Sequence, residues 1–232
     1  MALQGWRRLM VLAPHPDDET FGCGGLIALA ASQGVAVRVQ VLSDGALHGD
    51  AAVREGECLR AARALGLDES AVEFWRMPDR GLSAQTDLAV RLREACRQWA
   101  ADVVMAPSPW EVHPDHLATC RAAMQALADS RDAPLLGFYE VGQPLQPNRL
   151  VDITTVIGRK REAMAAYASQ LQQQRYDQQL LGLAAYRAYT LGPAATHAEA
   201  FWFPGREAQC ELAKLQTQCQ QQWARRWGSA GL

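Results

Sequence analysis

Short apolar runs alternate with longer amphipathic stretches along most of the chain. The runs end near turn-forming residues such as Pro, Gly or Ser, which is typical of strands buried on both faces of a parallel sheet. The stretches between them have helical composition, and two of them stop at Gly34 and Gly66, as helices often do. We expect strands at 9–13, 35–42, 72–76, 102–106, 135–141 and 151–153. We expect helices at 25–33, 53–65, 87–100, 114–128 and 155–174.

This alternation predicts the fold class. Strands that alternate with helices of this length indicate an α/β fold, a Rossmann-like three-layer sandwich with a mostly parallel sheet and helices on both faces. The sequence has no internal repeat and no linker rich in Gly, Ser or Pro, so we expect a single domain over residues 1–232. Ligands of such sheets bind beyond the carboxyl ends of the strands. The loops after Ala13 and Ala106 are therefore the first places to look for a site.

The last third of the chain has a weaker pattern. The glutamine-rich tract 170–179 is typical of a solvated surface rather than of a low-complexity tail. Farther on, the stretch 207–227 carries apolar side chains at helical spacing, so we expect a helical extension over about 205–232. Its apolar stripe would pack on the domain or on a second subunit, which leaves a homo-oligomer open. The stripe consists of Leu212, Leu215, Cys219, Trp223 and Trp227.

Composition and charge exclude several classes of protein. Apolar residues make up 49% of the chain and charged residues 21%, which suits a globular protein with a sizeable core. Lys and Arg total 23 against 25 Asp and Glu, and no long basic run is present, so we expect no nucleic-acid partner. The first apolar run stops at Pro14, too early to span a bilayer, and no secretory signal precedes it. We therefore expect a cytoplasmic protein without a transmembrane segment.

Two similar segments carry the candidate chemistry. His15-Pro16-Asp17-Asp18 follows the first expected strand, and His113-Pro114-Asp115-His116 follows the strand at 102–106. Proline suits the first position of a helix, so we expect both leading histidines to cap helix N-termini. A parallel sheet brings loops at its carboxyl edge together, so side chains of the two segments can converge. The candidates are His15, Asp18, His113 and His116.

Such a set of side chains is typical of a catalytic metal site. Two histidines and one carboxylate around an open position hold zinc in hydrolases, and Asp17 would stand next to the activated water as a base. Two histidines and one carboxylate also form the site of non-haem iron oxygenases. The α/β pattern and the additional carboxylate of Asp17 favour the hydrolase.

The same segments carry a resemblance to a known family. Ala13-Pro14-His15-Pro16-Asp17-Asp18-Glu19, with Gly24-Gly25 behind it, and the later segment 113–116 resemble the two signatures of the PIG-L / LmbE family of zinc-dependent de-N-acetylases. The resemblance covers about residues 8–203. Further matching segments are Arg54-Glu55-x-Glu57, Ala61-Ala62-x-Ala64-Leu65-Gly66, Pro78-Asp79-x-Gly81, Val151-Asp152-Ile153, Ser169-Gln170 and Ala198-Glu199-Ala200-Phe201.

The resemblance implies roles for the residues of both signatures. It implies that His15, Asp18 and His116 are metal ligands for Zn2+, with Fe2+ as an alternative in the cell. It implies that Asp17 is the general base and that His113 steadies the oxyanion or protonates the leaving amine.

Four further residues are expected around this site. Asp115 is expected to fix which ring nitrogen of His113 carries the proton. Arg54 and Asp79 resemble positions that contact the sugar in the family. Trp110, in the loop before His113, is expected to stack on a sugar ring at the mouth of the site.

The resemblance also implies the reaction. We expect a zinc-dependent hydrolase that removes an acetyl or other acyl group from an N-acylated amino sugar, by attack of zinc-bound water. The substrate is expected in a glycolipid, a lipopolysaccharide precursor or another glycoconjugate. An amidase acting on a thiol-sugar conjugate and a non-catalytic sugar-binding relative remain as alternatives.

Overall fold

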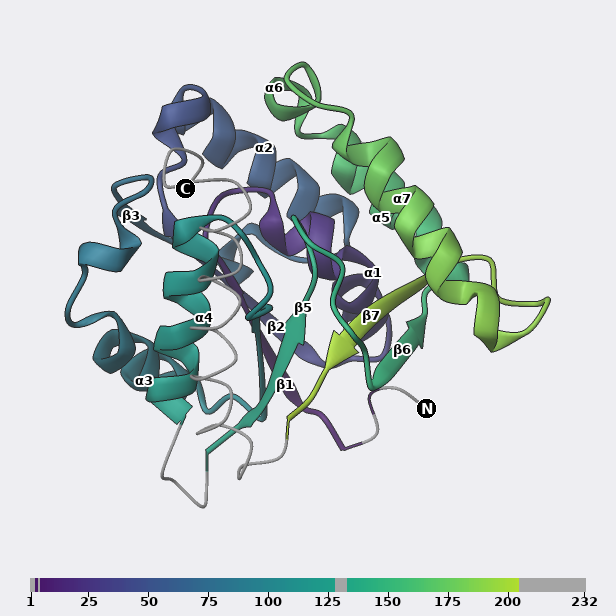
Figure 1. Ribbon diagram of the computed structural model, residues 1–232, viewed down its shortest axis with the longest axis horizontal. Helices are drawn as coiled ribbons and strands as arrows, with labels where there is room; N and C mark the ends of the chain where they lie inside the picture. Colours follow the sequence, from purple (N-terminus) through teal and green to yellow (C-terminus); the bar gives the residue numbers. More distant parts are fainter. Residues whose placement is uncertain (1–2, 4, 128–132, 205–232) are drawn as a thin grey trace, which may run out of the picture.

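A computed structural model describes residues 3, 5–127 and 133–204 (Figure 1). The expected helical extension at 205–232 lies outside the described residues. Among the helices that are described, none combines the length and the apolar composition that a bilayer span requires.

A mixed, mostly parallel sheet forms the centre of the molecule. Seven strands lie in the order β3-β2-β1-β4-β5-β7-β6. Neighbours among the first five in this order run parallel, whereas β7 is antiparallel to both β5 and β6. The strands are β1 (Arg8–Ala13), β2 (Ala36–Ser43), β3 (Val72–Met77), β4 (Val103–Pro107), β5 (Leu135–Tyr139), β6 (Arg149–Asp152) and β7 (Ala198–Trp202).

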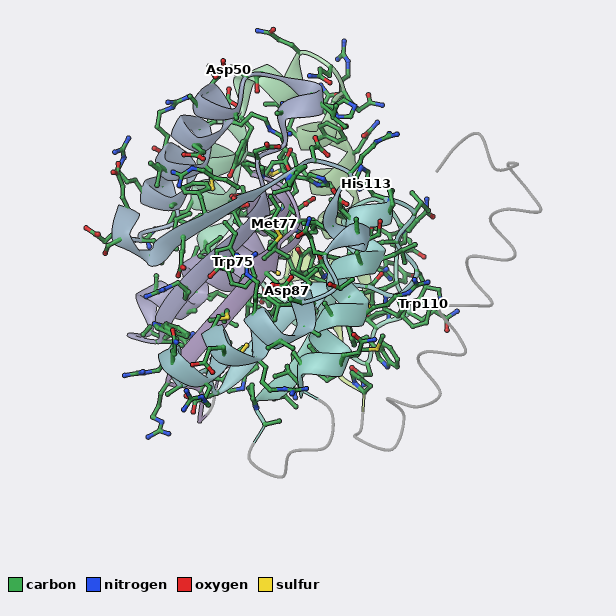
Figure 2. All side chains as sticks on the ribbon, turned by 90° about the vertical axis from the view of Figure 1, so that its left-hand side faces the viewer. Asp50, Trp75, Met77, Asp87, Trp110 and His113 are labelled. Carbon is green, nitrogen blue, oxygen red and sulfur yellow. The ribbon has the colours of Figure 1, made fainter. Side chains whose placement is uncertain are left out.

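Helices cover both faces of this sheet, which confirms the predicted fold class (Figure 1). One layer contains α1 (Asp18–Ser32), α2 (Ala51–Ala64), α5 (Ile157–Ala165) and α7 (Tyr176–Arg187), with the short α6 (Ala168–Leu171). The other layer contains α3 (Leu88–Trp99) and α4 (Pro114–Leu127), and Figure 2 turns it toward the viewer. Single 3-10 turns are η1 (Ala46–His48), η2 (Glu69–Ala71), η3 (Leu82–Ala84), η4 (Thr154–Val156) and η5 (Ala188–Leu191).

The place of β1 between two helix layers explains why residues 9–13 are all apolar. Side chains alternate between the two faces of a strand. Leu9 and Val11 belong to the hydrophobic cluster under α1 and α2, whereas Met10 and Leu12 belong to the cluster under α3 and α4. All four are buried, so no position of β1 between the two layers can be polar without cost.

The first helix begins earlier than the expected 25–33. α1 starts at Asp18 and includes the glycine-rich stretch 21–25, although glycine disfavours helices. Tertiary packing explains this start. A Cβ on Gly22 would lie 2.3 Å from Cδ2 of Tyr139, and a Cβ on Gly25 would lie 2.5 Å from Cγ2 of Ile153. The glycines therefore allow α1 to pack closely on its neighbours.

The last third differs most from the expectation. The single helix expected at 155–174 is divided into η4, α5 and α6. The apolar pattern predicted neither α7 nor β7. The chain leaves helical geometry at Tyr167, whose hydroxyl donates a hydrogen bond to Glu19. Part of the glutamine-rich tract is also not solvated, because Gln170 is buried and donates a hydrogen bond to the carbonyl of His48.

We predict that Gly22→Ala destabilises the fold. The new methyl group would overlap the ring of Tyr139, which is fully buried, and overpacking of this kind costs about 1–3 kcal/mol. Gly182→Ala is the matched control, because the structure shows open space at that helical glycine and alanine is the better helix former by about 0.5–1 kcal/mol. Urea unfolding measures both changes, and equal stability of Gly22→Ala and the parent protein would contradict the close packing.

Candidate metal centre and active site

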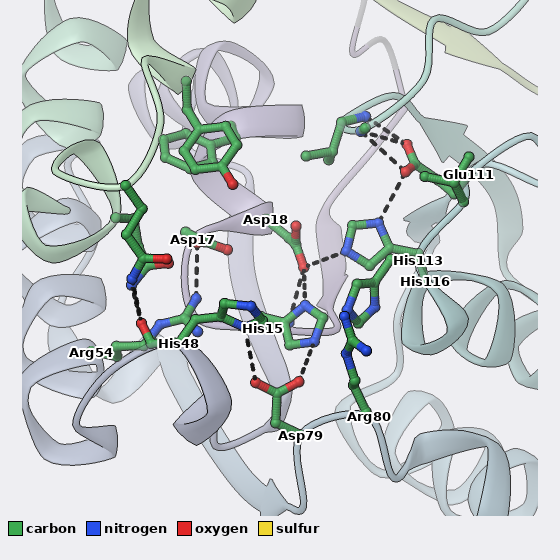
Figure 3. A pocket seen from close by; sticks show the side chains of 17 residues that line it. His15, Asp17, Asp18, His48, Arg54, Asp79, Arg80, Glu111, His113 and His116 are labelled. Atoms are coloured by element: carbon green, nitrogen blue, oxygen red, sulfur yellow. Dashed lines mark hydrogen bonds and ion pairs between the residues drawn. The ribbon is translucent and has the colours of Figure 1, made fainter. Parts of the chain in front are cut away.

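A cavity of about 260 Å³ opens at the carboxyl edge of the sheet. β1 leads into the segment that carries His15, Asp17 and Asp18, and the loop after β4 leads into the segment that carries His113 and His116. All five side chains line the cavity, as Figure 3 shows from close by. The two signature segments, about a hundred positions apart in the sequence, therefore meet at one place.

One oxygen of Asp18 joins the two segments. Oδ2 of Asp18 lies 3.2 Å from Nδ1 of His15 and 3.2 Å from Nε2 of His116. The same oxygen accepts a hydrogen bond from the backbone amide of His15 at 2.9 Å. All three side chains are at least nine-tenths buried. One carboxylate oxygen thus lies 3.2 Å from an imidazole nitrogen of each segment.

The second nitrogen of each imidazole lies against another carboxylate. Nε2 of His15 is 3.2 Å from Oδ1 of Asp79 and 3.2 Å from Oδ2 of Asp115. Nδ1 of His116 is 3.1 Å from Oε2 of Glu111. Metal-ligating histidines commonly have such a partner, which fixes the ring orientation and makes the ligating nitrogen more basic.

These carboxylates make the site favourable for positive charge. Burial alone would lower the pKa of His116, but Asp18 and Glu111 raise it to about 10. Burial likewise opposes a charged His15, yet Asp115, Asp18 and Asp79 raise its pKa well above the usual value. Despite burial, His116 and His15 hold the pKa of Asp18 well below the usual carboxyl value. A divalent cation at this point would replace the protons on the two imidazoles.

The donor set fits a borderline divalent metal ion. Imidazole nitrogen with carboxylate oxygen suits zinc and ferrous iron, whereas Mg2+ and Ca2+ prefer oxygen ligands. Among the described residues, donor atoms of two other groups lie within 4.8 Å of one another, His15 with His113 and His116, and His15 with Asp79 and Asp115. The contacts of Asp18 with both imidazoles favour the set that the sequence predicts.

Asp17 has a strained backbone and a buried side chain. Its φ of 149° lies where residues other than glycine rarely occur, which costs of order 1–3 kcal/mol. Arg54 donates a hydrogen bond to Oδ2 of Asp17 at 2.9 Å, and Glu19 accepts one from the backbone amide of Asp17 at 3.1 Å. Burial raises the pKa of Asp17 to about 7, against the lowering effect of Arg54. These contacts hold the carboxylate at the edge of the cavity.

His113 stands directly before α4 and acts as its cap. Its Nδ1 accepts a hydrogen bond from the backbone amide of Asp115 at 3.2 Å, and its ring packs edge-on against His15 at 4.6 Å between centroids. Burial and the neighbouring imidazoles of His15 and His116 lower the pKa of His113 to about 4. A neutral imidazole that accepts at Nδ1 carries its proton on Nε2, so His113 is a hydrogen-bond donor there.

Two expectations about these positions need correction. His113 is a cap as predicted, but the cap position of α1 is Asp17, and His15 lies two residues before it. The carboxylate of Asp115 does not contact His113. It lies against His15 and accepts hydrogen bonds from the backbone amides of Arg80 and Leu82.

The residues expected to contact the sugar lie in different environments. Arg54 and Asp79 both line the cavity, but Arg54 is bonded to Asp17 and Asp79 lies against His15. Trp110 does not belong to the cavity lining. Its ring packs on Trp202 of β7, with ring centroids 5.0 Å apart. The structure thus offers Trp110 a packing partner in place of a sugar ring.

Sequence reasoning did not assign the roles of two buried acids that shape the site. Glu111 contacts His116 and also accepts hydrogen bonds from the amides of Val141 and Gly142. Glu19 accepts hydrogen bonds from Thr20 and from Tyr167 in addition to the amide of Asp17. The position of Glu111 in the loop directly before the second signature is the sequence signal that points toward the site.

Two buried histidines and one carboxylate lie at the carboxyl edge of a parallel sheet, with a further carboxylate beside them. This arrangement is typical of the class of metal-dependent hydrolases on an α/β scaffold. The family model PIG-L, described as GlcNAc-PI de-N-acetylase, matches residues 10–127. The chain belongs to this family.

Named relatives cover most of the chain. The probable N-acetyl-alpha-D-glucosaminyl L-malate deacetylase 2 of Bacillus anthracis is 28% identical over 71% of this chain and 81% of its own length. The 2'-N-acetylparomamine deacetylase of Streptomyces fradiae is 31% identical over 70% of this chain and 73% of its own length. The 4-oxalmesaconate hydratase of Pseudomonas putida is 29% identical over 69% of this chain and 73% of its own length.

A solved structure agrees with the fold. The conserved protein TT1542 from Thermus thermophilus superposes with a TM-score of 0.76 at 34% identity, over 85% of this chain and 94% of that protein.

We predict that Glu111→Gln weakens metal binding about 10–100-fold, because the change removes the charge that holds Nδ1 of His116. Titration of Zn2+ into chelator-treated protein measures the dissociation constant. Glu73→Gln is the control, because Glu73 is exposed and pairs with Arg38 on the surface, away from the cavity lining. An unchanged dissociation constant for Glu111→Gln would contradict the role of Glu111.

Proposed function

We propose that this chain hydrolyses the N-acetyl group of an amino sugar within a glycoconjugate, with His15, Asp18 and His116 as ligands of Zn2+ or Fe2+. The carrying observation is the oxygen of Asp18 that lies 3.2 Å from both imidazoles, each of which is backed by another carboxylate. When bound, the ion would act as a Lewis acid on the amide carbonyl and would lower the pKa of water.

The residues of the chain supply proton transfer and orientation. Oδ2 of Asp17 is bonded to Arg54, so we assign Oδ1 as the oxygen that takes the proton of the attacking water and passes it to the amine nitrogen as the C–N bond breaks. His113 would donate from Nε2 to the carbonyl oxygen as it gains negative charge, because its Nδ1 is already an acceptor. Asp115 and Asp79 would keep the ring of His15 in place through its Nε2.

The cavity walls support a sugar substrate. Phe21 and Tyr176 pack together at 5.5 Å between ring centroids and line the cavity. Aromatic rings suit the apolar face of a sugar, and the hydroxyl of Tyr176 suits its hydroxyl groups. Gln173 and His48 line the cavity as well and offer polar groups to hydroxyls. Two of the named relatives are deacetylases of amino-sugar compounds, which supports the same substrate class.

The finer points of the sequence analysis remain predictions. They are a substrate in a glycolipid, lipopolysaccharide precursor or other glycoconjugate, Zn2+ as the metal with Fe2+ as an alternative, the cytoplasmic location, the single domain and a homo-oligomer.

We predict that Asp17→Asn lowers the rate of acetate release by at least about 100-fold and leaves the metal content unchanged, because an amide cannot accept the proton. The assay measures acetate from N-acetylglucosamine and N-acetylgalactosamine conjugates, free, nucleotide-linked, lipid-linked and thiol-linked. Asp87→Asn, at the exposed start of α3, is the control. Full activity of Asp17→Asn would remove Asp17 from the mechanism.

The same assay separates the alternatives. Release only from the thiol-linked sugar would indicate the amidase. Binding of an N-acetyl sugar by the metal-loaded protein without release would indicate the non-catalytic relative. Hydration of 4-oxalmesaconate without acetate release would replace the deacetylase proposal with the activity named for one relative.

A further inference from the structure

A buried ion pair contacts the backbone in the middle of α1. The carboxylate of Glu199 accepts hydrogen bonds from the amides of Gly25 at 2.7 Å and Leu26 at 2.8 Å. Lys160 donates to Oε1 of Glu199 at 2.6 Å and to the carbonyl of Phe21 at 2.9 Å. In a regular α-helix the amide of Gly25 bonds to the carbonyl of Phe21. The ion pair therefore binds both the donor and the acceptor that would form one helical hydrogen bond.

Three separate elements meet at this contact. Glu199 belongs to β7, Lys160 belongs to α5, and both act on α1. Their side chains are 4% and 2% exposed, so solvent does not screen the interaction. A Cβ on Gly24 would lie 3.3 Å from Cγ of Lys160, so the glycine leaves room for the lysine chain beside the helix.

The backbone groups that the ion pair binds begin at Phe21, one helical turn after Asp17. The amide of Phe21 donates a hydrogen bond to the carbonyl of Asp17 at 2.9 Å. The carbonyl of Phe21, on the other side of its residue, receives Lys160. Phe21 also lines the cavity. A shift of this carbonyl would move the first turn of α1, which carries Asp18.

A pair of charges in the core is not an efficient source of stability. Burying both ions costs free energy that their attraction only partly offsets, and well-packed apolar side chains often do as well. The hydrogen bonds to the α1 backbone are contacts that an apolar pair could not make. These hydrogen bonds lie just after the first turn of α1, so they point to a role in the placement of that turn.

We infer that Lys160 and Glu199 are positioning residues, which set the first turn of α1 so that Asp18 and Asp17 keep the geometry needed for metal binding and hydrolysis. This inference rests on the proposed function for its catalytic part. Its metal-binding part is independent of the substrate.

The test compares Lys160→Met, Glu199→Gln and the double variant with the parent protein. The double variant removes both charges at nearly constant volume, so it leaves no unpaired charge and is the variant best suited to fold. We expect the dissociation constant for Zn2+, titrated into chelator-treated full-length protein, to rise about 10-fold in each variant. We expect kcat for acetate release to fall about 10–100-fold with KM within about twofold.

Two comparisons distinguish positioning from a merely structural role. Because the two residues act as a unit, the double variant should lose no more than the more affected single variant. Leu92→Ala is the stability control, since Leu92 is fully buried in the cluster on the opposite face of the sheet. It should lower the melting temperature and leave Zn2+ affinity and kcat unchanged.

The outcomes decide the inference even where the substrate is not found. Weaker Zn2+ binding in the variants supports it whether or not acetate release is detected in the parent protein. Variants that resemble Leu92→Ala, with a lower melting temperature but parental Zn2+ affinity and kcat, would overturn it.

Discussion

The contact of one Asp18 oxygen with two imidazoles is the interaction on which the site depends. It joins the segment after β1 to the segment after β4, and its 3.2 Å distances require both helix starts to be placed correctly. The parallel sheet supplies the coarse placement, because β1 and β4 are neighbours that end at the same edge. The fine placement comes from carboxylates behind the histidines, Asp79 and Asp115 for His15 and Glu111 for His116.

So many buried acids at one place would be unstable without positive charge. Arg54 balances part of this negative charge, because it is paired with Asp17. The other acids raise the pKa of His116 to about 10, so they favour a cation at the imidazoles. A metal ion would serve the same purpose while freeing the imidazole nitrogens to coordinate it. The charge distribution therefore favours metal binding for the same reason that it makes the metal-free cluster costly.

The alternation of strands and helices predicted most of the fold. The rule that parallel strands end at one edge of the sheet predicted that the two signatures meet. Contacts between side chains of different loops were not predictable in this way. Trp110 was expected at the cavity, but its packing partner Trp202 lies on β7, a strand that the apolar pattern does not reveal. Glu111, one residue farther along, is the loop residue that contacts His116. The sequence places both in the loop but does not fix which one faces inward.

The start of α1 shows why local sequence could not predict the catalytic turn. Three glycines within 22–25 each disfavour a helix by about 0.5–1 kcal/mol relative to alanine, and Asp17 adds a strained backbone. This turn is therefore held from outside. Tyr167 donates a hydrogen bond to Glu19 within the turn, and Lys160, paired with Glu199, donates one to the carbonyl of Phe21 just after it. The glycines that weaken the helix also let Tyr139, Lys160 and Ile153 pack closely against it, so the precision of the site comes from tertiary contacts and not from helix propensity.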